Sequence, residues 1–260
     1  MSEAPLEVWN RELERACQVC GNIFSRVVVV GEASSTQDIA RARCGERAGL
    51  IVAALRQTAG RGRLGRAWAD TSHLGVALTC VVDATKFAPG VLALAAGLAA
   101  ARTVGEIVDL ESKGMIGLRW PNDVVERTGK GRKLAGVLIE QADGRALVGI
   151  GVNVNQASGD FPTELRETAV SIAMLAGTVD RLSVACMLVS RLQIALLQTP
   201  QQVAAEWSKL DVLVGSYRTF EYSGSQFSGR VKHVNPLGEI VIVSERGDEI
   251  RLPALATSLV

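Results

Sequence analysis

The connection between two apolar segments, 50–56 (LIVAALR) and 74–83 (LGVALTCVVD), restricts the possible folds more than any other feature of this chain. Each segment is apolar and rich in aliphatic residues, which predicts a buried strand. The connection carries three glycines and three arginines in Gln57–Trp68 (QTAGRGRLGRAW), and only RAWADTSH separates Gly65 from the second strand. A parallel crossover needs a dozen or more residues and usually a helix. We therefore expect a loop here and not a βαβ unit.

This spacing decides between several interpretations of the glycines. Gly60, Gly62 and Gly65 match G-x-G-x-x-G, and Asp83 follows about 20 residues later, as in a dinucleotide-binding fingerprint. That fingerprint has to open a helix, so the context excludes it. A P-loop is excluded because no Lys-Ser/Thr follows the glycines. Arginine binds phosphates and carboxylates, and glycine lets a ligand approach the backbone, so an anion-binding loop and a nucleic-acid arm both stay open.

Composition argues against the nucleic-acid alternative. The 260 residues carry a net charge of +1, with 48% apolar and 21% charged residues. Residues 211–260 hold five basic and six acidic residues. Nucleic-acid-binding proteins usually show a basic excess or a basic face, because many phosphate contacts supply the affinity. We therefore expect no nucleic acid as a partner.

Cysteine usage and the apolar runs indicate a cytoplasmic, globular protein. The five cysteines are odd in number and no secretory signal opens the chain, which favours a reducing compartment. Cys17 and Cys20 form a C-x-x-C late in a helical pattern, without the second pair that a zinc site needs. The most apolar run, Val91–Ala101, is too short to span a bilayer and predicts a buried helix, so we expect no membrane association.

The pattern along the chain predicts two regions. Residues 1–210 form the larger one, and residues 211–260 form a small β unit of short strands between Gly and Asn-Pro turns. In the larger region we expect helices within 1–24 and at 37–43, 90–108, 182–198 and 200–208, a short strand at 117–123, and strands 134–141 and 146–154 joined as a hairpin by ADGR. Ser35 and Thr36 are placed to cap the helix at 37–43.

Three further stretches place polar groups or bare backbone at the ends of predicted strands, where sites tend to lie. RWPND presents Asn122 and Asp123, and KLAG begins a strand with Lys133. GIGVNVN ends a predicted strand with Gly149, Gly151 and Asn153.

Together, GRGRLGRAW, RWPND, KLAGVLIE and GIGVNVN resemble, in this order, the signatures of the biotin protein ligase family, over about Ser34 to Asn155. The resemblance implies an α+β fold, with a class II aminoacyl-tRNA synthetase-like catalytic domain around a mixed sheet and a small C-terminal SH3-like β-barrel. It implies a cytoplasmic ATP- and Mg²⁺-dependent ligase, with homodimerisation possible in the family. Such an enzyme converts biotin to biotinyl-5′-AMP and transfers it to a lysine of a biotin carboxyl carrier protein.

The resemblance also implies roles for individual residues. Lys133 and Arg63 would be catalytic, and Asp123 would help to hold Mg²⁺. The residues implied for biotin are Ser35, Thr36, Gln57, Gly60, Arg61, Gly62, Arg63, Lys133, Gly136, Gly149 and Gly151. Those implied for ATP and the adenylate are Arg63, Arg66, Trp68, Asn122, Asp123, Lys133 and Asn153.

The chain departs from the family pattern at three positions. Gln37 stands where the family usually has asparagine, Leu64 where some relatives are basic, and Arg119 where lysine is common. Fewer than 35 residues precede the motif Ser34–Thr36 (SST), which is too few for the DNA-binding domain of some relatives, so we expect no operator binding. A lipoate or octanoate transferase is the neighbouring alternative, and it would need no partner for a ureido group.

Overall fold

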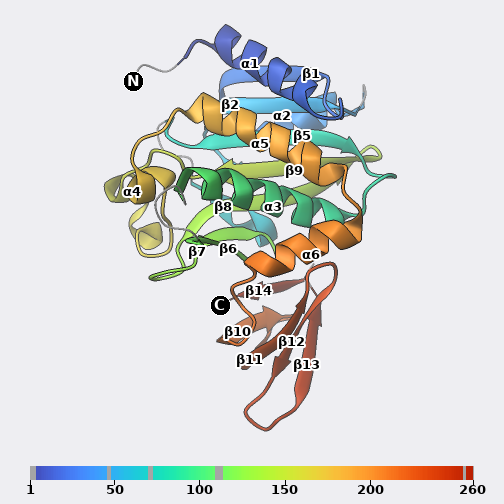
Figure 1. The fold of residues 1–260 in the computed structure, drawn as a ribbon, viewed down its shortest axis with the longest axis vertical. Coiled ribbons are helices and arrows are strands. Elements are labelled where there is room, and N and C mark those ends of the chain that lie inside the picture. The colour runs from blue at the N-terminus through green and yellow to red at the C-terminus, as the bar shows by residue number, and fades with distance from the viewer. Residues whose placement is uncertain (1–3, 46–47, 70–72, 109–113, 254–255, 260) are drawn as a thin grey trace.

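The protein is described by a computed structural model that covers residues 4–45, 48–69, 73–108, 114–253 and 256–259. A seven-stranded sheet forms its centre, in the order β1-β2-β5-β9-β8-β7-β6 (Figure 1). The strands are β1 (Arg26–Ala33), β2 (Leu50–Gln57), β5 (Val76–Asp83), β9 (Arg145–Val152), β8 (Lys133–Ala142), β7 (Asp123–Glu126) and β6 (Ile116–Arg119). β1 and β2 are parallel and every other neighbouring pair is antiparallel, so the sheet is mixed, as expected.

The connection between β2 and β5 is a loop, which confirms the prediction from its length. The two strands pair antiparallel, so no crossover helix is needed. The described part of the connection folds into a small hairpin, with β3 (Gly60–Arg61) paired to β4 (Ala67–Trp68) around a 3₁₀ turn at Arg63–Gly65. Leu64 holds a positive φ of 55° in this turn and is 61% exposed. The hairpin places Trp68 against the sheet at the predicted site.

Both faces of the sheet are covered by helices, and strand β2 contributes side chains to the hydrophobic cluster on each face. Because side chains alternate along a strand, Ile51 and Ala53 join the main core, while Leu50 and Val52 join a smaller cluster on the other face. The main core lies under the helices α1 (Leu6–Val19), α3 (Pro89–Val108), α5 (Arg181–Leu196) and α6 (Pro200–Leu210) (Figure 1). α2 (Thr36–Arg43) covers the opposite face. The predicted site lies on the α2 face.

Helix α3 is a core helix of this fold. It spans 20 residues, and its most apolar window has a mean hydropathy of 1.7, so it is long and apolar enough to cross a membrane by length and composition alone. It packs against α5 and strands β8 and β9, and 67% of its most apolar window is buried. The small residues of this run are what allow that close packing.

The C-terminal region is all-β, as predicted. Its antiparallel sheet has the order β13-β12-β11-β10-β14, built from β10 (Tyr217–Tyr222), β11 (Ser225–Asn235), β12 (Glu239–Val243), β13 (Glu249–Pro253) and β14 (Thr257–Leu259). It lies below the main sheet and beside α6 in Figure 1. Its buried residues, such as Phe220 and Ile240, belong to the same hydrophobic cluster as the main core. A domain division between residues 210 and 211 stays a prediction.

Two features were not expected. The strand β7, which begins two residues after Pro121, gives the sheet an additional member between β6 and β8. The segment 158–176 forms the 3₁₀ turns Ser158–Asp160 and Thr163–Leu165 and the short helix α4 (Ile172–Ala176). Each of these elements is too short to produce a clear period in the sequence.

Candidate functional site

The floor of the site is a row of small residues that crosses five strands. The strand registers align Ala54 of β2 with Ala77 of β5, Gly151 of β9, Gly136 of β8 and Asp123 of β7. The first four positions carry a methyl group or no side chain at all. A row of this kind leaves a shallow trough on the sheet where other rows are filled by side chains.

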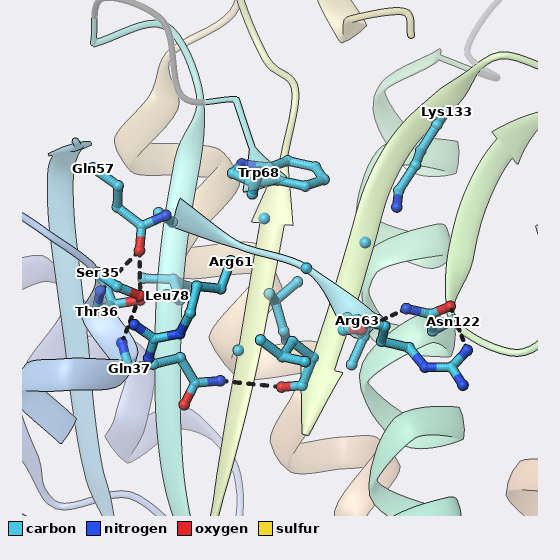
Figure 2. A pocket seen from close by; sticks show the side chains of 18 residues that line it. Ser35, Thr36, Gln37, Gln57, Arg61, Arg63, Trp68, Leu78, Asn122 and Lys133 are labelled. Atoms are coloured by element: carbon cyan, nitrogen blue, oxygen red, sulfur yellow. Dashed lines mark hydrogen bonds between the residues drawn. The ribbon is translucent and has the colours of Figure 1, made fainter. Parts of the chain in front are cut away.

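Trp68 of the hairpin lies over this row, between Gln57 and Lys133 (Figure 2). A Cβ added at Gly151 would lie 2.5 Å from Cε2 of the indole, and one at Gly136 would lie 3.2 Å from its Cζ3. Lys133 Nζ stands 5.5 Å from the centre of the ring, within the range of a cation–π contact. The two glycines therefore let the indole rest directly on the sheet.

Two cavities meet at Trp68. The first, of about 50 Å³, lies on the glycine row, and the second, of about 470 Å³, lies beyond it toward β14. The predicted residues that line the first are Ser35, Thr36, Gln57, Arg61, Gly62, Arg63, Trp68, Asn122, Lys133, Gly136, Gly149 and Gly151. Those that line the second are Gly62, Arg63, Arg66, Trp68, Asn122, Asp123, Lys133 and Asn153. Segments 100 residues apart in the chain are thus brought to one place.

A chain of hydroxyl groups supports the end of the first cavity at α2. Thr79 Oγ1 of β5 donates to Thr36 Oγ1 at 2.8 Å, and Thr36 Oγ1 donates to Gln57 Oε1 at 3.1 Å. The backbone N–H of Thr36 donates to the same Gln57 oxygen at 2.8 Å. Ser35 caps α2 by accepting from the N–H of Gln37, as the capping prediction required. Thr79, fully buried, was not predicted, although a threonine inside an apolar strand was the available signal.

The side chain of Arg61 turns away from the floor. Its guanidinium pairs with Asp38 of α2 at 2.7 Å and with Glu140 of β8 at 3.4 Å, and Glu140 also pairs with Arg41 at 2.7 Å. These ion pairs join the hairpin to the helix and the sheet on either side. The side chain of Arg61 therefore fastens the hairpin, and contact of its backbone with biotin stays a prediction.

Arg63 and Asn122 approach each other where the cavities meet. Arg63 donates to Asn122 Oδ1 at 3.5 Å, and Asn122 Nδ2 donates to the carbonyl of Val137 at 2.6 Å. Burial lowers the pKa of Arg63 below its ordinary value, although the charge of Asp123 opposes this. Arginine stays protonated at neutral pH even so. A half-buried guanidinium at this junction attracts an anionic ligand.

Asp123 is the centre of an ion-pair cluster at the same junction. Its Oδ1 accepts from Lys133 Nζ at 2.6 Å, and its Oδ2 accepts from Arg119 at 2.9 Å. Burial opposes ionisation of Asp123, but the charges of Lys133 and Arg119 outweigh burial and hold its pKa below the usual value. Asp123 is therefore ionised at neutral pH and fixes the position of the Lys133 ammonium.

Comparisons with known proteins agree with this geometry. The family model described as "Biotin/lipoate A/B protein ligase family" matches residues 33–156, which contain all the motifs above. The chain is 33% identical to the biotin–[acetyl-CoA-carboxylase] ligase of Mycobacterium tuberculosis over 250 residues, covering 89% of this chain and 91% of that protein. The chain belongs to the biotin protein ligase family.

Other relatives of this ligase show how far the likeness extends. The structure resembles the biotin protein ligase of Aquifex aeolicus in complex with biotin and ATP, with a TM-score of 0.78 and 26% identity over 91% of this chain and 99% of that one. A bifunctional ligase/repressor of Bacillus subtilis is 35% identical over 161 residues, which are 58% of this chain and 47% of that protein. The mixed sheet and the C-terminal sheet are thus those of the family.

Two predicted residues of the ligase, Gly60 and Asn153, make contacts that give them a structural role. Gly60 lines neither cavity among the described residues; a Cβ there would lie 2.7 Å from the carbonyl of Trp68, so it is needed for the close pairing of the hairpin. Asn153 Nδ2 donates to the carbonyls of Lys133 and Val170, so its amide nitrogen links the start of β8 to the segment before α4. Ligand contact by Gly60 and Asn153 stays a prediction.

The residues of the ligase do not fit a preformed Mg²⁺ site. No group of three His, Cys, Asp or Glu side chains capable of holding a metal occurs in the described part of the chain. Both carboxylate oxygens of Asp123 are already engaged by cations. Mg²⁺ is often bound by few protein carboxylates and mainly by substrate phosphates and water. The geometry thus favours Asp123 as the partner of Lys133 and not as a metal ligand.

Proposed function

We propose that this enzyme condenses biotin with ATP to form biotinyl-5′-AMP and then transfers the biotinyl group to a lysine of a biotin carboxyl carrier protein. The observation that carries the proposal is the meeting of the two cavities at Arg63, Asn122 and Lys133. A carboxylate held in the first cavity and a phosphate held in the second would repel each other. Two cations at the junction offset that repulsion and bring the reacting groups together.

The first cavity suits the bicyclic head of biotin. Thr36 gives its hydroxyl proton to Gln57, so its oxygen can only accept a further hydrogen bond, while the Ser35 hydroxyl keeps its proton available for a carbonyl. The glycine row lets a flat ring lie on the backbone. At about 50 Å³ the cavity is below the roughly 300 Å³ of typical ligand pockets, so Trp68 moves off the glycine row when biotin enters.

The second cavity suits the nucleotide. Among its described lining residues are four cationic side chains, those of Arg63, Arg66, Arg119 and Lys133, and one carboxylate, that of Asp123. This excess of positive charge favours a polyphosphate. The indole of Trp68 borders this cavity as well and provides a surface on which adenine can stack. Leu259 of β14 also lines it, so the C-terminal sheet contributes to the nucleotide site.

The chemistry needs no nucleophile from the protein. A carboxylate oxygen of biotin attacks the α-phosphorus of ATP, the bond to the β-phosphate oxygen breaks, and pyrophosphate leaves. Lys133 and Arg63 stabilise the negative charge that gathers on the α-phosphate oxygens. In the second step the carrier amine attacks the carbonyl carbon of the mixed anhydride and AMP leaves, which forms an amide. The carrier amine loses its proton in this step.

The proposal is tested by incubating the full chain with biotin, MgATP and a biotin carboxyl carrier domain. Mass spectrometry should show one biotinyl group added to one lysine of the carrier, and ATP–pyrophosphate exchange should depend on biotin. Exchange that runs equally well without biotin would overturn the proposal. Exchange supported by lipoate or octanoate and not by biotin would replace it with the neighbouring transferase class.

A further inference from the structure

Arg181 is a buried charged residue for which the reaction above has no use. It is the first residue of α5, directly after the cap at Asp180, and it is 4% exposed. Neither cavity has Arg181 among its described lining residues. Its guanidinium carbon lies 5.6 Å from the centre of the Trp9 ring of α1, which is a cation–π contact. Burying a charge is costly unless its donors are used, so the contacts of those donors indicate what this arginine does.

The guanidinium joins the ends of two strands. Nε donates to the carbonyl of Gly75 at 2.8 Å, and Nη2 donates to the carbonyl of Leu55 at 2.9 Å. Leu55 lies near the end of β2, and Gly75 directly precedes β5. Arg181 therefore bridges the two ends of the connection that carries the hairpin of β3 and β4.

The described strand pairing stops before these two ends. The ladder between β2 and β5 ends at Ala54 and Ala77. Beyond that point β2 continues beside β1 as far as Gln57, and β5 begins at Val76 beside β9. A guanidinium carries its donors in a rigid planar fork. The fork can therefore set the separation of two carbonyl groups that lie past the end of the ladder.

Asn155, the last residue of the motif GIGVNVN, strengthens the same junction. Its side-chain amide donates to the carbonyl of Val179 at 2.9 Å and accepts from the N–H of Val179 at 3.1 Å. Its backbone N–H donates to the carbonyl of Leu74 at 2.8 Å. Asn155 thus ties the segment before α5 to the segment before β5, which fixes the place from which the side chain of Arg181 extends.

The two strand ends determine where parts of the first cavity lie. Gln57, which lines this cavity, follows Leu55 by two residues. The hairpin begins three residues later, at Gly60, and places Trp68 on the glycine row. A shift at the base of the connection would move these groups relative to the sheet. Small displacements of positioning groups can lower a reaction rate substantially.

We propose that Arg181 is a positioning residue of the ligase reaction, which fixes the base of the hairpin connection and thereby sets the places of Gln57 and Trp68 at the first cavity. The assignment rests on the proposed function. Arg181 acts through the carbonyls of Leu55 and Gly75 and not by contact with a substrate. Lysine at this position would keep the charge, but its ammonium is a point donor without the fixed fork. It would therefore hold the two carbonyls less precisely.

The test compares Arg181→Lys with Arg191→Lys, which is the matched control. Arg191 lies toward the other end of the same helix and pairs with Glu106 of α3. Two rates are measured at a temperature at which every variant is folded. The first is trypsin cleavage within residues 61–66 of the free chain, and the second is kcat/KM for biotin in ATP–pyrophosphate exchange. The melting temperature of each variant is measured separately.

In Arg181→Lys, trypsin cleavage within residues 61–66 should be about fivefold faster or more, because the hairpin is held less firmly at its base. The value of kcat/KM for biotin should fall about tenfold or more. Arg191→Lys should match the native enzyme in both rates. A lower melting temperature of Arg181→Lys with native values of both rates would show that Arg181 only supports the fold, which would overturn the assignment. A change in one rate without the other would also overturn it, because the loss of activity has to act through the hairpin.

Asn155→Ala decides between these outcomes if Arg181→Lys fails to fold. It removes both side-chain hydrogen bonds to Val179 and leaves Arg181 in the chain. Both rates should change in the same direction as expected for Arg181→Lys but to a smaller extent, and native values of both would overturn the assignment. Absence of biotin-dependent exchange by the native chain would remove the proposed function. The cleavage rates need no activity and would still show whether Arg181 fixes the hairpin, which separates the two failures.

Discussion

Replacing Lys133 by alanine should nearly abolish adenylate formation while leaving the fold intact. Lys133 Nζ stands at the junction of the two cavities, 2.6 Å from Asp123 Oδ1 and over the ring of Trp68. Loss of one preorganised group that stabilises transition-state charge typically lowers kcat by about 10²–10³-fold, or about 3–4 kcal/mol. We expect a loss of that size in biotin-dependent ATP–pyrophosphate exchange.

The effect on stability should be much smaller. The side chains of Lys133 and Asp123 are 31% and 19% exposed, so their pair lies between the surface and the buried class of ion pairs. Arg119 also remains beside Asp123 after the substitution. We estimate a loss of about 1 kcal/mol in the free energy of unfolding, which corresponds to a melting temperature lower by about 2–4 °C.

The assay compares Lys133→Ala with two other variants. Lys133→Arg keeps the charge but changes its shape, and should recover part of the exchange rate. Lys130→Ala is the matched control, because this exposed lysine lies in the β7–β8 connection three residues before Lys133, and its side chain pairs only with Glu167 among the described residues. A rate for Lys133→Ala within threefold of native, with native-like melting, would refute the assignment of charge stabilisation to this residue. A fall in the melting temperature far beyond the expected 2–4 °C or so would refute the claim that Lys133 contributes little to stability.

Three other substitutions test the packing and electrostatics of the site. Gly151→Ala should force Trp68 off the floor, because the new Cβ would lie 2.5 Å from the indole, and tryptophan fluorescence should change. The new methyl group would also occupy the floor on which biotin lies, so biotin KM should rise about tenfold or more, and native-like values of both would contradict this packing. Thr79→Val removes the hydroxyl group that donates to Thr36, so it should raise KM for biotin severalfold and leave KM for ATP unchanged. Thr79→Ser, which keeps a hydroxyl group, should restore a KM for biotin close to the native value. Burial opposes ionisation of Glu126, but hydrogen bonds from Arg132 outweigh burial and lower the pKa of this carboxyl group. The pair therefore stabilises the fold above about pH 4.3, the ordinary pKa of glutamate. This stabilisation is lost as the pH falls from there through the lowered pKa of the folded state. Glu126→Gln should therefore be less stable than native by about 1–2 kcal/mol at pH 7 in urea unfolding, and a difference that persists undiminished at pH 3 would contradict this.

Local pattern was enough to predict most of the helices and strands and the family of this protein. The length of the segment between β2 and β5 excluded a crossover helix, and the ADGR turn with its flanking strands predicted the β8–β9 hairpin. These are properties of neighbouring residues, such as side-chain alternation and turn chemistry, which a sequence displays directly. The motifs around Arg63, Asn122 and Lys133 likewise predicted residues that the fold brings together.

Only the tertiary structure decided how these residues face one another. Gly136 and Gly151 lie side by side because β8 and β9 pair in one particular register, and a shift of either strand by one residue would have turned its glycine to the opposite face of the sheet. The pairing of Asp123 with Lys133, the support of Thr36 by Thr79 and the orientation of the Gln37 amide also depend on contacts between different helices and strands. Such contacts follow from long-range packing, which no local period of the sequence encodes.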